Sequence, residues 1–147
     1  MLPAALFSIM RIRGAMMRSP GSARDKLRTM FEGVSGGTKA CEAQCGAIRG
    51  CPIGNLALEM AHREPAIAQK LRQVFTQWRA GVESVLQAGV ASGEFVLEDP
   101  RAVAESLIAF IEGSILLAKA TGDTAVFERL AKGADAITYS AKPPFTL

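Results

Sequence analysis

The sequence predicts an all-α protein that folds as one helical domain. Apolar residues recur at intervals of three and four in several segments, which is the spacing of one helix face. β-Branched residues never gather in an alternating run, as a half-buried strand would require. With 147 residues, of which 49% are hydrophobic and 21% are charged, the chain is long enough for a single sizeable core.

The first predicted helix follows the turn-forming residues Pro20-Gly21-Ser22 and extends from Ala23 to about Val34. Its apolar face consists of Leu27, Met30, Phe31 and Val34. Ser35-Gly36-Gly37 is expected to end this helix, because glycine disfavours a helix interior. Residues 35–50 are therefore predicted to form a mostly irregular connection, with at most one helical turn at residues 41–45.

Two further helices are predicted in the middle of the chain. One begins at Cys51-Pro52, where proline suits the first helical turn, and runs to about His62. The other follows Glu64-Pro65 and continues for about 26 residues until Ser92-Gly93 stops it. Its apolar stripe consists of Ile67, Leu71, Val74, Phe75, Trp78, Val82, Val85, Leu86 and Val90.

Asp99-Pro100 predicts the start of the next helix, with a carboxylate as N-cap and proline at the first position. This helix is apolar on two faces, and we expect a partner subunit to cover one of them. The first face holds Val103, Leu107, Phe110, Ser114 and Leu117, and the second holds Ala104, Ile108, Ile111, Ile115 and Ala118. A last helix is expected after the turn at Thr121–Thr124, and Pro143-Pro144 cannot continue it.

Charge is distributed unevenly along the chain. Residues 1–50 hold eight basic and three acidic residues, whereas the remainder holds nine basic and eleven acidic residues. A basic N-terminal third is compatible with phosphate contacts, but arginines on a solvated segment explain it equally well. Neither interleaved aromatic residues nor a recognition helix accompany the charge, so the sequence does not favour nucleic-acid binding by this chain alone.

The chain shows no pattern typical of a membrane protein. The apolar start at Met1–Met10 ends at Arg11, well short of the ~20 residues that a span needs. The run Leu107–Ala118 contains Glu112 and is also too short. Three cysteines leave one thiol unpaired under any intramolecular pairing, which favours a reducing compartment. We therefore predict a cytoplasmic protein without a membrane partner.

Three stretches of the sequence carry a family resemblance. They are Gly50–Glu59, the long helix around Phe75–Trp78 that ends at residues 88–93, and Ala104–Gly113 followed by Leu116-Leu117-Ala118. From about residue 23 to residue 139 the chain resembles the C-terminal domain of TetR/AcrR-family transcriptional regulators. In that family an N-terminal helix-turn-helix binds operator DNA and the C-terminal helices enclose an effector pocket. The last two helices pair with their symmetry mates in a four-helix dimer interface.

The resemblance implies a division of the chain. Residues 1–22 form an N-terminal segment that corresponds at most to the helix linking the two domains. Residues 23–141 form the helical ligand-binding and dimerisation domain, and residues 142–147 form a tail. Because residues 1–22 are too few for a three-helix reading head, we expect the chain to lack its own DNA-binding head. DNA is then a partner only if such a head is supplied.

The expected protein partner is a second copy of the chain. The resemblance places the interface of this homodimer on the last two helices. The residues assigned to it are Ile108, Ile111, Ile115, Phe127, Leu130, Ala134 and Ile137.

Methionines and aromatic residues indicate a pocket for a small apolar or amphipathic effector. The candidate ligand-binding residues are Met30, Phe31, Asn55, Glu59, Met60, Phe75, Trp78 and Phe110. His62, Gln77 and Glu112 are further polar groups in otherwise apolar helices. Each of these side chains can equally belong to the packed core or face water.

Three other motifs invite a chemical interpretation, and none is complete. Gly33–Gly37 fits the G-x-S-x-G pattern around Ser35, but a hydrolase elbow needs a strand before the serine. Cys51 lies at a helix N-terminus beside Arg49, where the pKa of a redox-sensing thiol could be lowered. Four zinc ligands could come from Cys41, Cys45, Cys51 and His62, although a second C-x₂₋₄-C pair is missing. We predict no catalytic residue, no bound metal and no cofactor.

Two function classes follow from these observations. The leading one is a TetR-like transcriptional regulator, a repressor, that binds a small effector and dimerises. The alternative is a stand-alone dimerisation module that captures a full-length relative in a heterodimer. An enzyme is least favoured, because His62 is the single histidine and no pair of acid and base groups stands out.

Overall fold

The computed structural model describes residues 14–138, and the side chains of residues 14–133. All regular structure in this range is helical, which confirms the predicted all-α class. After a short helical segment at residues 14–18, the helices are α2 (Ala23–Cys45), α3 (Pro52–Met60), α4 (Pro65–Ala91), α5 (Pro100–Thr121) and α6 (Val126–Thr138). No helix in this part of the chain is long and apolar enough to cross a membrane.

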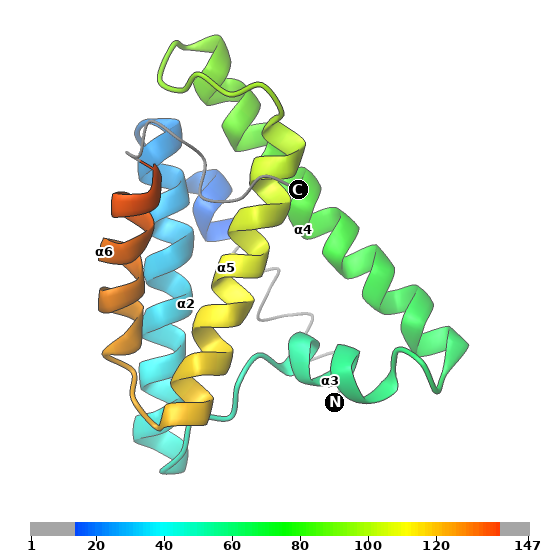
Figure 1. Cartoon of the computed structure of the whole chain (residues 1–147). Helices are drawn as coiled ribbons and strands as arrows, with labels where there is room; N and C mark the ends of the chain where they lie inside the picture. The colour runs from blue at the N-terminus through cyan, green and yellow to red at the C-terminus, as the bar shows by residue number, and fades with distance from the viewer. Residues whose placement is uncertain (1–13, 139–147) are drawn as a thin grey trace.

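The helices enclose one main core. In Figure 1, α2, α5 and α6 stand side by side, α4 slants away from them, and α3 lies across the base. The most extensive packing is between α4 and α5, and α2 packs against both. Met16 is fully buried in this core, so residues 14–18 belong to the folded domain. Large buried side chains that the helices contribute to this core are Met30, Trp78, Val82, Leu86, Ile111 and Phe127.

The proline, aspartate and glycine residues that were predicted to begin or end helices mark the limits of α4 and α5 correctly. Proline is at the first position of α4, and its 27 residues give a length of about 40 Å. The Asp99 side chain accepts a hydrogen bond from the Ala102 backbone N–H (3.0 Å) and caps α5. Gly122 ends α5 with a φ of 64°, a left-handed conformation that glycine adopts without steric cost. α3 ends at Met60, two residues before the predicted limit at His62.

The prediction for residues 35–50 is wrong in its first part. α2 does not end near Val34 but continues to Cys45, where Gly46 takes a left-handed conformation. Gly36 and Gly37 lie inside the helix, at a propensity cost of about 1 kcal/mol each relative to alanine. Val34 is buried in the core, and this tertiary packing together with the helix-forming residues 39–44 outweighs that cost.

Two caps fix the beginning of α2. Ser22 and Asp25 form a reciprocal capping box within the helix. In addition, the carboxylate of Glu94, from the connection between α4 and α5, accepts hydrogen bonds from the backbone N–H groups of Ala23 (2.9 Å) and Arg24 (3.0 Å). These bonds, the one from Arg24 first, lower the pKa of Glu94. The start of α2 is thereby tied to the far end of α4.

We expect Glu94→Gln to lower the melting temperature by a few degrees at neutral pH. Because the pKa of Glu94 is lowered on folding, its stabilisation is present above the ordinary value of 4.5 and is lost as the pH falls through the folded-state value. Thermal melts of the variant and the wild type should therefore converge below that value. The exposed Glu98 provides the control, and Glu98→Gln should melt like the wild type at every pH. A difference for Glu94→Gln that persists in acid would contradict this assignment.

Candidate ligand-binding cavity

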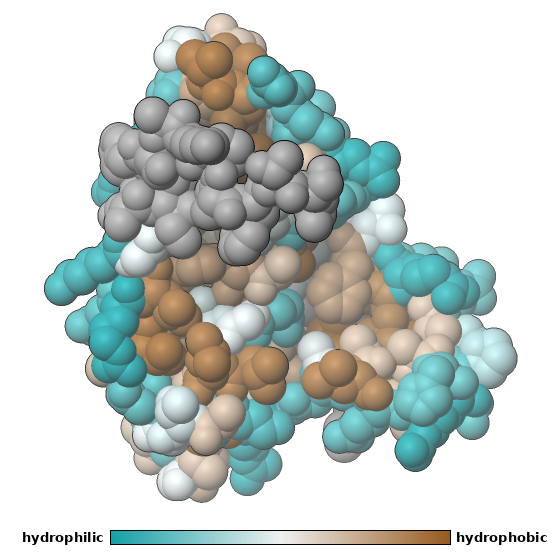
Figure 2. All heavy atoms as spheres, in the orientation of Figure 1, coloured by the Kyte–Doolittle hydropathy of each residue, from teal (hydrophilic) through white to brown (hydrophobic). Residues whose placement is uncertain are grey.

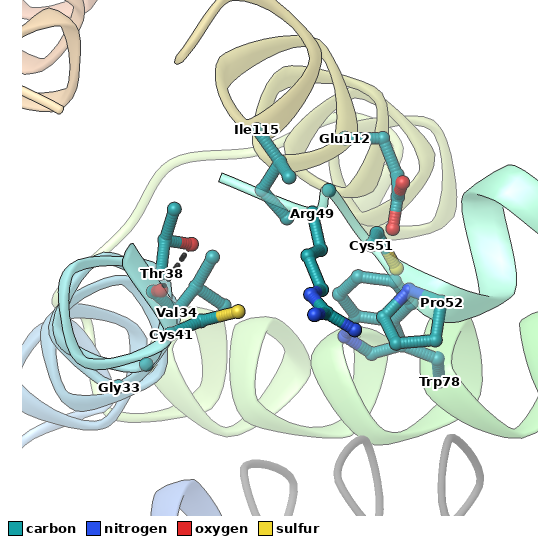
Figure 3. Close-up of a pocket in the computed structure, with 12 residues that line it drawn as sticks. Gly33, Val34, Thr38, Cys41, Arg49, Cys51, Pro52, Trp78, Glu112 and Ile115 are labelled. Carbon is teal, nitrogen blue, oxygen red and sulfur yellow. Dashed lines mark hydrogen bonds between the residues drawn. The ribbon is translucent and has the colours of Figure 1, made fainter. Parts of the chain in front are cut away.

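A cavity of about 250 Å³ lies between α2, α4, α5 and the segment that leads into α3. Figure 3 shows its lining side chains converging from these elements. The wall is mainly apolar, with a few polar groups, which is the composition typical of small-molecule sites. The lining residues are Gly33, Val34, Gly37, Thr38, Cys41, Arg49, Gly50, Cys51, Pro52, Trp78, Glu112 and Ile115.

Small residues on α2 leave room for this cavity. Gly33, Gly37 and Cys41 are spaced by four residues, so they lie above one another on the same face of the helix. A Cβ atom added at Gly37 would meet nothing within 4 Å. Gly37, which the sequence analysis placed at a helix end, is thus part of the cavity wall on α2, and its spacing of four residues from Gly33 and Cys41 was the signal that could have revealed this.

A tight turn holds Arg49 and Cys51 at the cavity. Gly50 has a φ of 85°, which permits the turn into α3. The Asn55 side chain donates a hydrogen bond to the Arg49 backbone oxygen (2.9 Å) and accepts one from Lys119 Nζ (3.3 Å). Cys51 is the N-cap residue of α3, and its Sγ accepts a hydrogen bond from the Gly54 N–H (3.4 Å). Arg49 is exposed, and its side chain reaches in among the other lining residues (Figure 3).

Cys51 and Glu112 form a half-buried pair at the wall nearest to α3. Burial, and next the neighbouring Glu112, raise the pKa of the Cys51 thiol to about 12. Burial also raises the pKa of Glu112, while the hydrogen bond from Cys51 partly opposes this. The idea of a thiol activated by Arg49 and the helix N-terminus is therefore wrong, because Cys51 stays protonated near neutral pH.

A second cavity, of about 290 Å³, adjoins the first. Gly50, Cys51, Glu112 and Ile115 line both cavities, so the Cys51–Glu112 pair lies where the two meet. The second cavity also contacts Phe75, whose ring stacks on that of Trp78 with centroids 6.2 Å apart. The two aromatic rings therefore connect the walls of neighbouring cavities.

The structure separates the candidate ligand-binding residues into three groups. Trp78 lines the first cavity, whereas Asn55 and Phe75 line the second. Glu59 is exposed and Met60 is half-buried on α3, and neither lines these two cavities. Met30 is buried in the core, Phe31 packs against the core, and the ring of Phe110 contacts that of Phe31 at a centroid distance of 5.9 Å. Their roles in ligand binding stay predictions.

The residues assigned to a dimer interface lie mostly inside the protomer. Ile108, Ile111, Ile115 and Phe127 are buried in its own core, and Leu130 packs against that core. The side chains of Ala134 and Ile137 lie outside the described residues. The interface on these residues stays a prediction.

The opposite side of α5 is exposed and apolar. Leu116 is 57% exposed and Leu117 is 44% exposed. They belong to a stripe without charged residues, in helical register: Ala102, Ser106, Ala109, Gly113, Leu116, Leu117 and Ala120. Figure 2 shows hydrophobic residues gathered on this face over the lower part of α5 and over α3.

Two chemical hypotheses from the sequence fail. Ser35 lies inside α2, so the strand and turn that a hydrolase elbow requires are not there. Cys45 and His62 are both exposed, and no group of three potential metal ligands forms among the described residues. The four side chains considered as zinc ligands therefore do not assemble into a site.

Residues 23–134 match the family model described as the tetracyclin repressor-like (TetR), C-terminal domain. The chain belongs to this family. The match covers α2 to α5 and most of α6 of this TetR C-terminal domain, including every residue that lines the two cavities.

Two relatives agree with this assignment. The TetR domain is 35% identical over 79 residues to an uncharacterized HTH-type transcriptional regulator in the lacX 3′ region of Lactococcus lactis subsp. lactis. This alignment covers 54% of the chain and 39% of that regulator. The fold is similar to the crystal structure of a TetR transcriptional regulator from Chloroflexus aurantiacus J-10-FL, with a TM-score of 0.77 and 22% identity. That superposition covers 94% of this chain and 69% of the other.

Proposed function

We propose that this chain is the effector-binding and dimerisation domain of a transcriptional regulator. The observation that carries the proposal is the cavity of about 250 Å³, walled by α2, α4 and α5 in a domain of the TetR family. Its volume exceeds that of the ~150 Å³ cavity known to bind benzene, so one ring with a short polar arm fits. Its effector is accordingly small and amphipathic.

In this family contact with DNA is the task of a helix-turn-helix head, and the family model that residues 23–134 match describes the C-terminal domain. The aligned relative from Lactococcus is named as an HTH-type regulator, and this chain spans 39% of its length. We therefore propose that this domain is the sensing half of a repressor and that a helix-turn-helix head makes the operator contacts.

Dimerisation is the second part of the proposal, and the partner is a second copy of the chain. The uncharged stripe on α5 supports it, because small residues permit close approach of two helices and exposed leucines favour burial. A two-fold axis would place the stripe of each copy against the same stripe of the other. The core residues Ile108, Ile111 and Ile115 then support the interface from within each protomer.

The cavity is well placed to couple ligand binding to the N-terminal side of the domain. α2 forms one wall, and its first residues are held by Glu94 and lie next to residues 14–18. A ligand that fits one position of α2 better than another shifts the equilibrium between them. That movement is the proposed signal to a DNA-binding head.

Gly37→Leu tests the effector site, because the new side chain projects from α2 into the cavity. We expect it to weaken the binding of single-ring amphipathic molecules by at least about tenfold, since a filled cavity cannot admit the ring. Trp78 is the single tryptophan and lines the cavity, so its fluorescence reports binding directly. The titrants are 2-phenylethylamine, 2-phenylethanol and phenylacetate.

Gly36→Leu is a matched control for this experiment. Gly36 is the neighbouring residue of the same helix, also has nothing within 4 Å of an added Cβ, and does not line the cavity. Both variants remove one helical glycine and should gain about 0.8 kcal/mol of stability. Equal affinities for a titrant in both variants would place its binding site elsewhere and contradict the proposed function.

A further inference from the structure

Glu112 is half-buried, and among the described side chains its Oε1 is the one solvent-inaccessible polar atom that has no hydrogen-bond partner. The carboxyl group points toward Cys51, whose thiol donates to it, at the junction of the two cavities (Figure 3). Burying an acceptor without a donor is unfavourable, so a group that supplies the donor gains binding free energy.

No basic side chain among the described residues forms an ion pair with the carboxylate of Glu112, although Arg49 lines the first cavity and Lys119 the second. Arg79 on α4 pairs with Glu83 and Glu105, and Lys119 on α5 donates to Asn55. Arg49, from the segment before α3, is exposed and forms no ion pair with the described acidic residues.

The chain makes room for Glu112 at a specific position. A Cβ atom added at Gly54, in the first turn of α3, would collide with Oε2 of Glu112. The backbone of α3 therefore approaches the carboxyl group closely because residue 54 has no side chain.

Aromatic rings complete the surroundings of this carboxyl group. Trp78 lines the first cavity together with Glu112, and Phe75 lines the second cavity together with Glu112. The π-face of an aromatic ring attracts a cation, and tryptophan does so most strongly. A carboxylate beside such rings favours a ligand whose positive charge is attached to an apolar body.

We propose that the effector is an organic cation, a primary amine or amidine on a small apolar body, whose charged end binds Glu112. This inference rests on the proposed effector site and names the chemical class of its ligand. A protonated amine donates the missing hydrogen bond and also compensates the charge of the half-buried carboxylate. A neutral alcohol of the same shape supplies only the hydrogen bond, and a carboxylate of the same shape is repelled.

Three probes with one phenyl body separate these possibilities. They are 2-phenylethylamine (cation), 2-phenylethanol (neutral) and phenylacetate (anion), titrated into the full chain by calorimetry near neutral pH. We expect the amine to bind at least about tenfold more tightly than the alcohol, because a charge-assisted hydrogen bond is about twice as strong as a neutral one. Phenylacetate should bind more weakly than both.

Glu112→Gln removes the charge and keeps the shape of the side chain. The amine should then lose about tenfold in affinity, while the alcohol should change by less than about twofold. Glu105→Gln, an exposed carboxylate two turns away on the same helix, is the control and should leave all three affinities unchanged. Circular dichroism melts of both variants verify that they are folded.

The outcomes separate this inference from the proposed function. Equal affinity of the amine and the alcohol for the wild type, with both weakened by Gly37→Leu, would overturn the cationic ligand class and leave the cavity as the effector site. An amine preference that survives Glu112→Gln would also overturn the inference. Failure of all three probes to bind the wild type would count against both the inference and the proposed site.

Discussion

Phe127→Ala should destabilise the fold by about 3–5 kcal/mol and lower the melting temperature by about 10 °C. Phe127 is 1% exposed and is the largest of the fully buried side chains. Its ring meets that of Phe31 edge to face, with centroids 6.1 Å apart, and so joins α6 to α2. Removing it leaves a cavity that the surrounding helices can fill only in part.

The same experiment distinguishes a core role from the interface role that the sequence assigned to Phe127. A residue that packs inside one protomer destabilises the chain by the same amount at every protein concentration. If a residue acts mainly between subunits, the loss of stability caused by its substitution depends on protein concentration. Thermal melts over a hundredfold range of concentration make this comparison. Leu58→Ala, at a position that is 74% exposed, should melt within about 2 °C of the wild type.

Leu117→Glu should raise the dissociation constant of the proposed dimer by at least about thirtyfold. The substitution places a charge on the uncharged stripe of α5 in each copy, and like charges that face each other cost several kcal/mol. Leu117 is 44% exposed in the protomer, so the stability of the monomer should change by less than about 0.5 kcal/mol. Sedimentation velocity measures the shift from the dimer to the 15.6 kDa monomer.

Val96→Glu is the matched control, because this valine is 99% exposed in the connection between α4 and α5. It introduces the same charge away from the stripe and should leave the dissociation constant unchanged. A Leu117→Glu protein that stays as dimeric as the wild type would contradict the placement of the interface on α5. Equal weakening by both substitutions would point to a general charge effect.

The fold could be predicted from the sequence where local signals and tertiary packing agree. Pro65 and Ser92-Gly93 bracket α4, and Asp99-Pro100 and Gly122 bracket α5. In each case a residue with a strong backbone preference lies where an apolar stripe begins or ends. Local chemistry and the core therefore specify the same helix limits.

The prediction failed where the two conflict. Gly36 and Gly37 disfavour a helix locally, yet the buried Val34 and the residues after them keep α2 helical to Cys45. Such conflicts concentrate at functional sites, because a site needs residues that the fold alone would not select. Both glycines weaken the helix, and Gly37 at the same time provides space for the cavity.

Other features depend on contacts that no local pattern encodes. The periodicity of α5 showed that both of its faces are apolar, but it could not show which one the protomer covers. Cys51 and Glu112 interact although they belong to different helices. The sequence alone therefore showed Glu112 only as a polar residue within an apolar segment. The position of Trp78 in a cavity wall was predicted, whereas those of Arg49 and Cys51 were not.

The central claim is that the cavity between α2, α4 and α5 is the effector site. A crystal structure of the protein saturated with 2-phenylethylamine tests it most directly. We predict the phenyl ring beside Trp78 and the amine within hydrogen-bond distance of Glu112. A cavity that stays empty at saturating concentration, or an amine bound on another surface of the domain, would contradict the claim.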